Sequence, residues 1–201
     1  MLVNCNAELL TITVDDAQRV SGLLQVPVGA RICFVLAHGA GAGMSHPFMA
    51  GVADGLAERG IATMRYQFPY MEQGSKRPDA PKLAQATVRA AVSQASHLVP
   101  KLALIAGGKS FSGRMTSQAQ AALPLSGVRA LVFLGFPLHP AGRPSDERAD
   151  HLFEVKIPML FLQGTRDALA ETQTPGRPMV DHPEYPKPSV GWINFLLPPT
   201  L

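Results

Sequence analysis

A serine set among glycines is the feature of this 201-residue chain whose residue types best fit covalent chemistry. The segment Gly108-Lys109-Ser110-Phe111-Ser112-Gly113 approximates the pattern G-x-S-x-G, with Ser112 in the last glycine position. In that pattern a strand turns sharply into a helix, and small neighbours let the two elements approach each other. The pattern predicts Ser110 as a nucleophile, beside a helix N-terminus whose dipole favours developing negative charge. The alternative is an ordinary helix N-cap at Ser110 or Ser112.

A glycine-rich loop earlier in the chain could stabilise that charge. The sequence His38-Gly39-Ala40-Gly41-Ala42-Gly43 follows a predicted strand, and its glycines let backbone N–H groups turn toward a site. We therefore predict an oxyanion hole formed by the N–H groups of Ala40 and Phe111. His38 is expected to orient the loop by hydrogen bonding rather than to act as a base. The alternative is a flexible loop with no role.

The same two segments do not fit nucleotide-binding patterns. A phosphate-binding P-loop ending in Gly108-Lys109-Ser110 needs a glycine at position 103, where Ala103 stands. The earlier loop has Met44 at the sixth position of the dinucleotide fingerprint. We therefore expect no nucleotide.

A carboxylate follows the last clear apolar run. Asp167 comes shortly after the predicted strand Pro158 to Leu162, and its place after Ser110 agrees with the chain order Ser, Asp, His of one class of catalytic triad. Such a carboxylate holds the imidazole in one tautomer and stabilises its protonated form. A turn or capping role is the usual reading of a single Asp.

The elements expected to position these residues alternate between apolar strands and amphipathic helices, which predicts an α/β domain with a mostly parallel sheet and helices on both faces. A hairpin through Asp15-Asp16 comes first. The expected strands are Leu9 to Val14, Val20 to Val26, Arg31 to Ala37, Ile61 to Tyr66, Leu102 to Ala106, Val128 to Leu134 and Pro158 to Leu162, and the expected helices are Pro47 to Arg59, Lys82 to His97 and Ser112 to Ala122. Long loops are expected at Gln67 to Pro81 and Gly135 to Asp150.

We expect a single domain over residues 1–201, with a core at about 8–170 and an atypical tail at 171–201. Prolines crowd that tail and oppose a further strand and helix, although Trp192 to Leu197 could form one short apolar anchor. The tail prolines are Pro175, Pro178, Pro183, Pro186, Pro188, Pro198 and Pro199.

Composition points to a soluble, cytoplasmic protein. Hydrophobic residues make up 46% and charged residues 16%, and the net charge of +3 comes from scattered basic residues, so neither disorder nor a nucleic-acid partner is expected. No apolar run is long enough to span a membrane, and the N-terminus lacks the pattern of a secretory signal. Cys5 and Cys33 make neither a disulfide framework nor a metal site, and Cys33 is expected in the core.

Longer stretches resemble the α/β-hydrolase superfamily. They are HGAGAGMSHPFM (38–49), RYQFPYMEQGSKRPD (65–79), GGKSFSGRMTS (107–117), LVFLGFPLHPAGRPS (131–145) and PMLFLQGTRDAL (158–169). Within the superfamily the chain looks like the small branch related to dienelactone hydrolases, which includes testis-expressed protein thirty and NSL complex subunit three (KANL-type) proteins. This resemblance implies the α/β-hydrolase fold, with Ser110 as nucleophile and Asp167 as acid. Relatives usually have glycine where Ser112 stands.

The resemblance also implies a C-terminal helix, a strand and a segment carrying the catalytic histidine, and here the chain departs. His182 follows Asp167 by 15 residues, too few for that helix and strand, and Pro183 replaces an expected serine. The helix and strand portion is therefore expected to be incomplete. Three alternatives stay open: His182 reaches the site through an irregular tail, one of the loop histidines His46, His139 or His151 replaces it, or the base is missing.

The expected function is hydrolysis of a small ester, thioester or similar acyl bond by Ser110, Asp167 and His182, without metal or organic cofactor. A small-molecule acyl substrate is the expected partner, with no nucleic acid and no membrane. The alternative is a catalytically impaired hydrolase fold that binds a protein partner. A third alternative is a truncated or frame-altered tail that leaves the domain incompletely folded.

Overall fold

An eight-stranded sheet organises the chain in the computed structural model, which describes residues 6–138, 148–164 and 191–195. The strand order is β1-β2-β4-β3-β5-β6-β7-β8. The first two pairings, β1 with β2 and β2 with β4, are antiparallel, and all the others are parallel. The strands are β1 (Glu8–Thr13), β2 (Arg19–Gln25), β3 (Ile32–Ala37), β4 (Ile61–Tyr66), β5 (Ala103–Lys109), β6 (Val128–Leu134), β7 (Met159–Gly164) and β8 (Gly191–Phe195).

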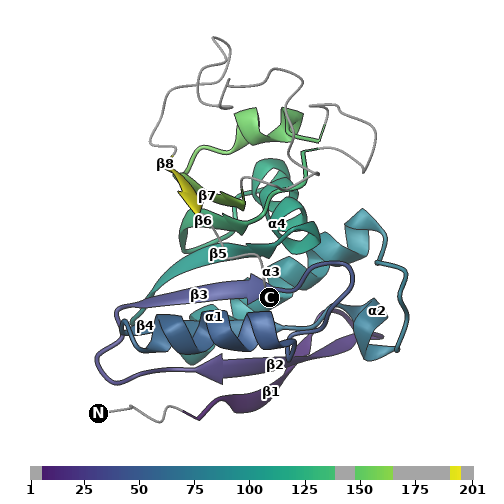
Figure 1. The fold of residues 1–201 in the computed structure, drawn as a ribbon. Coiled ribbons are helices and arrows are strands. Elements are labelled where there is room, and N and C mark those ends of the chain that lie inside the picture. The colour runs from purple at the N-terminus through teal and green to yellow at the C-terminus, as the bar shows by residue number, and fades with distance from the viewer. Residues whose placement is uncertain (1–5, 139–147, 165–190, 196–201) are drawn as a thin grey trace.

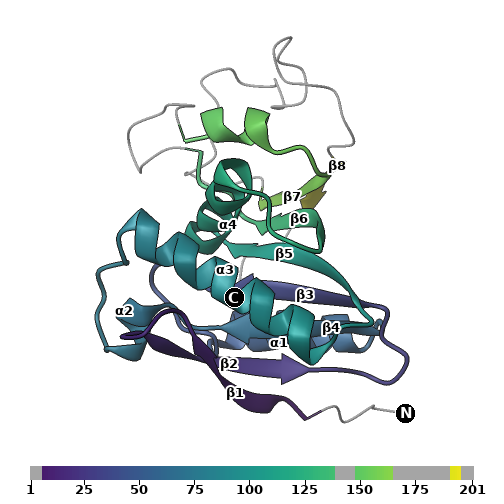
Figure 2. The same ribbon diagram turned by 180° about the vertical axis from the view of Figure 1, so that it is seen from behind.

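Helices cover both faces of this sheet, as Figure 1 and the reverse view in Figure 2 show. Helix α1 packs on one face, where Phe34, Leu36 and Met49 form a small buried cluster. Helices α3 and α4 pack on the other face, over the main core. The helices are α1 (Pro47–Ala57), α2 (Pro69–Glu72), α3 (Pro81–Leu98) and α4 (Phe111–Ala122), with a 3₁₀ helix, η1, at Asp150–Glu154. The predicted α/β class with a mostly parallel sheet is confirmed.

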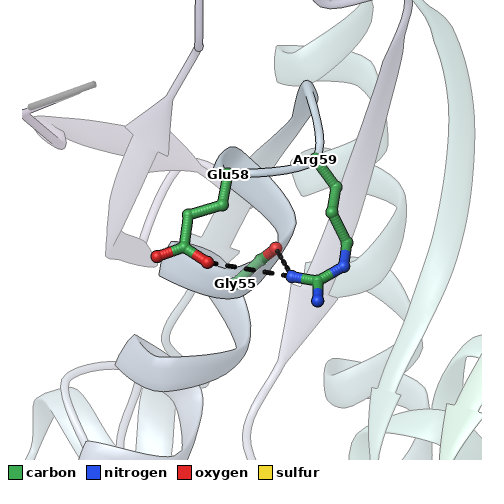
Figure 3. A network of polar contacts seen from close by, with 3 residues as sticks. All are labelled: Gly55, Glu58 and Arg59. Atoms are coloured by element: carbon green, nitrogen blue, oxygen red, sulfur yellow. Dashed lines mark hydrogen bonds and ion pairs between the residues drawn. The ribbon is translucent and has the colours of Figure 1, made fainter. Parts of the chain in front are cut away.

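Local sequence signals explain how these elements begin and end. The Asp15 carboxylate accepts hydrogen bonds from the N–H groups of Ala17 and Gln18 and so closes the β1–β2 hairpin. Pro47 opens α1, where its missing N–H costs nothing. Beyond the end of α1, Arg59 donates to the Gly55 carbonyl at 2.7 Å and lies 3.8 Å from the Glu58 carboxylate (Figure 3). That ion pair is exposed and adds little stability.

Three expectations about the elements need correction. The predicted loop Gln67 to Pro81 contains the short helix α2. Strand β5 runs three residues past Ala106, because the flat Gly107-Gly108 backbone keeps pairing with β3 and β6. The prolines were expected to oppose a further strand in the tail, but the short apolar segment around Trp192 forms β8, paired in parallel with β7.

The connection between β7 and β8 includes most of the proline-rich tail and lies outside the described residues, as does the central part of the predicted loop Gly135 to Asp150. The expected incomplete C-terminal portion, the domain boundaries and the cytoplasmic location stay predictions. Among the helices in the described ranges, none is long and apolar enough to cross a membrane.

Gly107 gives a direct test of how tightly β5 is packed. A Cβ at this position would lie 1.8 Å from the Val132 carbonyl oxygen in β6, at a backbone φ of +153°. We expect Gly107→Ala to lower the free energy of unfolding by about 3 kcal/mol or more, because β5 and β6 must separate to admit the methyl group. Urea denaturation followed by circular dichroism measures the change.

The matched control is Gly51→Ala in α1, where a Cβ meets nothing within 4 Å. Alanine in an exposed helix position should raise the free energy of unfolding by about 0.5–1 kcal/mol. Equal stabilities for the two variants would contradict the packing described here.

Candidate active site at the β5–α4 corner

Ser110 occupies a strained corner between β5 and α4. Its backbone angles are φ 50° and ψ −107°, and within the described residues no other non-glycine residue has a positive φ. Such a conformation costs about 1–3 kcal/mol, so the surroundings must enforce it. The Ser110 N–H donates to the Gly135 carbonyl at 3.0 Å, which ties the corner to the end of β6. Ser110 is the N-cap residue of α4, but its side chain makes no capping hydrogen bond, so the alternative of an ordinary side-chain cap at this residue is wrong.

Small residues around the corner leave room for close approach of the main chain. A Cβ on Gly108 would lie 2.4 Å from the Ala37 carbonyl oxygen of β3. A Cβ on Gly113, in the first turn of α4, would lie 3.0 Å from the Gly108 carbonyl oxygen. The helix can therefore start directly against β5 and β3, as the sequence pattern predicts.

The glycine-rich loop after β3 lies beside Ser110. Ala37, the last residue of β3, pairs in parallel with Gly108 of β5, so both strands end at the same edge. A Cβ placed on Gly39 would lie 3.7 Å from the Ser110 Cβ. Ala40 is exposed, and the turn and loop hydrogen bonds of the described residues do not use its N–H or that of Phe111 as a donor.

His38 fixes the start of this loop from within the core. Its Nδ1 lies 2.8 Å from the Gly39 carbonyl oxygen, and its Nε2 accepts from the Phe68 N–H at 3.3 Å. The ring is fully buried, and desolvation lowers its pKa. A neutral imidazole with both nitrogens engaged orients the loop, as predicted, and has no free nitrogen with which to serve as a base.

Further contacts to the loop come from the end of β4 and the segment that follows it. The Tyr70 hydroxyl donates to the Ala40 carbonyl at 3.1 Å, and burial raises the pKa of Tyr70 to about 12. Gln67 accepts from the Met44 N–H at 2.8 Å, and Arg65 donates to the Met44 carbonyl at 3.2 Å. These supporting roles were not predicted; for Tyr70, the aromatic residues directly after a buried strand were the available signal.

No histidine in the described part of the chain is hydrogen-bonded to Ser110. The His46 Nδ1 accepts from the Phe48 N–H and so caps α1. The His151 Nε2 lies 2.7 Å from the Ser117 hydroxyl, seven residues or about 10 Å further along α4 than Ser110. These contacts weaken the hypothesis that His46 or His151 replaces the base, while His139 and His182 lie outside the described residues.

Asp167 also lies outside the described residues, three positions after the end of β7. The carboxyl ends of β5, β6 and β7 are in register at one edge, with Lys109 opposite Leu134 and Leu134 opposite Leu162. Neighbouring strands are about 4.8 Å apart, so Asp167 follows a strand that ends within about 10 Å of β5.

Cys33 and Lys109 are two further residues whose side chains could take part in chemistry. Cys33 is buried in β3, and desolvation raises the pKa of its thiol to about 12, so it is the core residue that the sequence predicts. Lys109 is exposed with its Nζ 4.8 Å from the centre of the Phe48 ring. Among the described residues, no group of three His, Cys, Asp or Glu side chains could hold a metal ion.

Comparison with known proteins agrees with this fold. The profile of a family described as "Alpha/beta hydrolase domain" matches residues 30–182. A dienelactone hydrolase from Anabaena variabilis has a similar structure, with a TM-score of 0.67 at 22% identity over 84% of this chain and 82% of that one. A lidless a/b serine hydrolase from Xanthomonas campestris gives 0.62 at 22% identity over 82% and 73%, and an esterase from Pyrococcus furiosus gives 0.64 at 14% over 83% and 74%.

The environment of His151 predicts a pH-dependent stability. Desolvation and the nearby Arg114 charge lower its pKa to about 4, while Asp150 opposes them. The unfolded chain, in which histidine titrates near 6.5, then binds more protons between about pH 6.5 and 4. The His151 contribution is therefore complete above about pH 6.5 and is lost as the pH falls toward 4.

We expect His151→Gln to flatten the fall in the free energy of unfolding over this window, as measured by urea denaturation at a series of pH values. Glutamine does not titrate and can still bond to the Ser117 hydroxyl. His97→Gln, which removes an exposed imidazole from α3, is the matched control. The same slope in His151→Gln and in the parent protein would contradict the assignment.

Proposed function

This chain belongs to the alpha/beta hydrolase domain family, and from that membership we propose that it is a serine hydrolase of small ester, thioester or similar acyl bonds. The observation that carries the proposal is the Ser110 backbone, held in a strained conformation where β5 turns into α4 and beside the loop at Gly39. A strained nucleophile corner is how this fold exposes a serine hydroxyl at the top of its sheet.

The chemistry proceeds in two steps. A histidine takes the proton of Ser110 as its oxygen attacks the substrate carbonyl carbon, and the alcohol or thiol leaves with that proton as the acyl-enzyme forms. Water, activated by the same histidine, then releases the carboxylic acid and restores the serine. Both steps pass through a tetrahedral oxyanion, which the N–H groups of Ala40 and Phe111 stabilise.

These two donors suit that task for separate reasons. The Phe111 N–H is in the first turn of α4, where the N–H groups have no intrahelical partner. The Ala40 N–H belongs to a loop whose carbonyl groups are hydrogen-bonded by His38 and Tyr70. The loop therefore need not reorganise when negative charge develops on the substrate. Loss of one preorganised donor typically costs about 3 kcal/mol of transition-state stabilisation.

We assign Asp167 as the acid and His182 as the base. Asp167 follows a strand that ends close to β5, and the order Ser110, Asp167, His182 is that of this fold's triads. His182 is 15 positions after Asp167, and a chain of that length can extend about 50 Å. The alternatives are His139 as the base and a site without a histidine base.

Two finer points complete the proposal. The sequence stretches that include His38, Arg65 and Ser110 support the dienelactone-hydrolase-related branch that contains the KANL-type proteins. A protein that only binds a partner needs neither a strained backbone at Ser110 nor a hydrogen-bonded loop beside it. We therefore favour a hydrolase that acts on a small-molecule substrate.

Ser110→Ala should abolish labelling by a fluorophosphonate probe and remove the hydrolysis of p-nitrophenyl acetate, because the attacking oxygen is lost. Gel fluorescence and release of p-nitrophenol measure the two effects, with Ser93→Ala on the exposed face of α3 as the matched control. Equal turnover by Ser110→Ala and the wild type would favour the scaffold alternative.

The same assay locates the rest of the triad. Asp167→Asn should lower kcat by two to four orders of magnitude, and His182→Gln by about three or more. His46→Gln and His139→Gln should stay within a few-fold of the wild type. Full activity in His182→Gln with loss in His139→Gln would move the base to residue 139, and full activity in both would refute a histidine base at either position.

A further inference from the structure

The first turn of α4 is joined to the end of β3 by a buried hydroxyl. The Ser112 side chain is fully buried, and its Oγ donates to the Ala37 carbonyl at 2.6 Å, with the Lys109 carbonyl at 3.1 Å as a weaker second acceptor. The Ser112 hydroxyl donates to carbonyl groups and caps no helix N–H, so the alternative of an N-cap at Ser112 is wrong.

Both ends of this contact lie next to the two oxyanion donors. Ala37 ends β3 and is three residues before Ala40, while Ser112 directly follows Phe111. The two donors belong to different elements, so their separation depends on how the start of α4 sits against the end of β3. The regular pairing of β3 with β5 ends at Ala37 and Gly108, and the Ser112 hydroxyl adds a link at that edge.

Neighbouring residues make room for the Ser112 contact and hold the next turn of the helix. A Cβ on Gly108 would lie 2.4 Å from both the Ser112 Oγ and the Ala37 oxygen, so a side chain there would displace the hydrogen bond. One turn later the Thr116 hydroxyl bonds to the Ser112 carbonyl at 2.8 Å and to the Gly107 carbonyl at 3.4 Å. Thr116 is equally buried, and beyond these bonds to α4 and β5 its side chain is hydrogen-bonded with Tyr66 of β4, so none of these bonds links α4 to β3.

We propose that Ser112 is a positioning residue, which sets the distance between the Ala40 and Phe111 N–H groups by holding α4 to the end of β3. It touches no substrate and acts through the main chain. The inference rests on the proposed function for its effect on catalysis, but the link itself is a property of the fold and can be measured without turnover.

Ser112→Ala removes the hydroxyl and leaves the methyl carbon in place. We expect kcat for p-nitrophenyl acetate to fall about 10- to 100-fold with KM within about twofold, because a misplacement of about 1 Å disturbs the transition state more than substrate binding. Thr116→Val removes a buried hydroxyl from the same helix and should leave kcat within about threefold. Melting curves confirm that each variant is folded at the assay temperature.

Amide hydrogen exchange supplies the readout that needs no activity. Ser112→Ala should speed exchange at the hydrogen-bonded amides of Ser110 and Arg114 at the start of α4, whereas Thr116→Val should not. If the wild type shows no Ser110-dependent turnover, the proposed function fails and the exchange rates still decide the link. Unchanged exchange at both amides in folded Ser112→Ala, or an equal loss of kcat in Thr116→Val, would overturn the positioning role.

Discussion

The rest of the site depends on the main-chain strain at Ser110, which the fold must maintain. A serine at φ 50° relaxes unless its neighbours prevent it, and here they do so through close main-chain contacts. The Ser110 N–H is tied to Gly135 beyond β6, and the glycines on either side let α4 start against β5 and β3 with no side chain between them. The contacts of the main chain with the parallel sheet thus maintain the strained backbone at Ser110.

The loop after β3 is the second half of the same construction, and buried polar contacts hold it. Both ring nitrogens of His38 are hydrogen-bonded at the start of the loop, and the Tyr70 hydroxyl donates to the Ala40 carbonyl. The main chain of Met44, later in the loop, is hydrogen-bonded by Gln67 and Arg65. Buried donors and acceptors are costly to leave unpaired, so each contact resists movement of the loop. A loop fixed in this way can present an N–H group without reorganisation, which is what electrostatic stabilisation of a transition state requires.

Local signals in the sequence were sufficient for much of this structure. Strands β4 and β6 match their predicted bounds, because each is a mainly apolar run with clear ends, and Ser110 is predicted by the residues next to it. Contacts between distant segments were not predictable in the same way. The Ser112 hydroxyl meets a carbonyl 75 positions earlier, and Tyr70 meets one 30 positions earlier, so their roles emerge only after the sheet has brought those segments together. The extension of β5 through Gly107 and Gly108 was missed because glycine usually signals a turn.

The most direct measurement is a crystal structure of the protein after reaction with a small alkyl fluorophosphonate. The proposed function predicts phosphorus bonded to the Ser110 Oγ, with the phosphoryl oxygen within about 3 Å of the Ala40 and Phe111 nitrogens. An adduct on another residue, or a phosphoryl oxygen on Ser110 that faces away from both nitrogens, would contradict it.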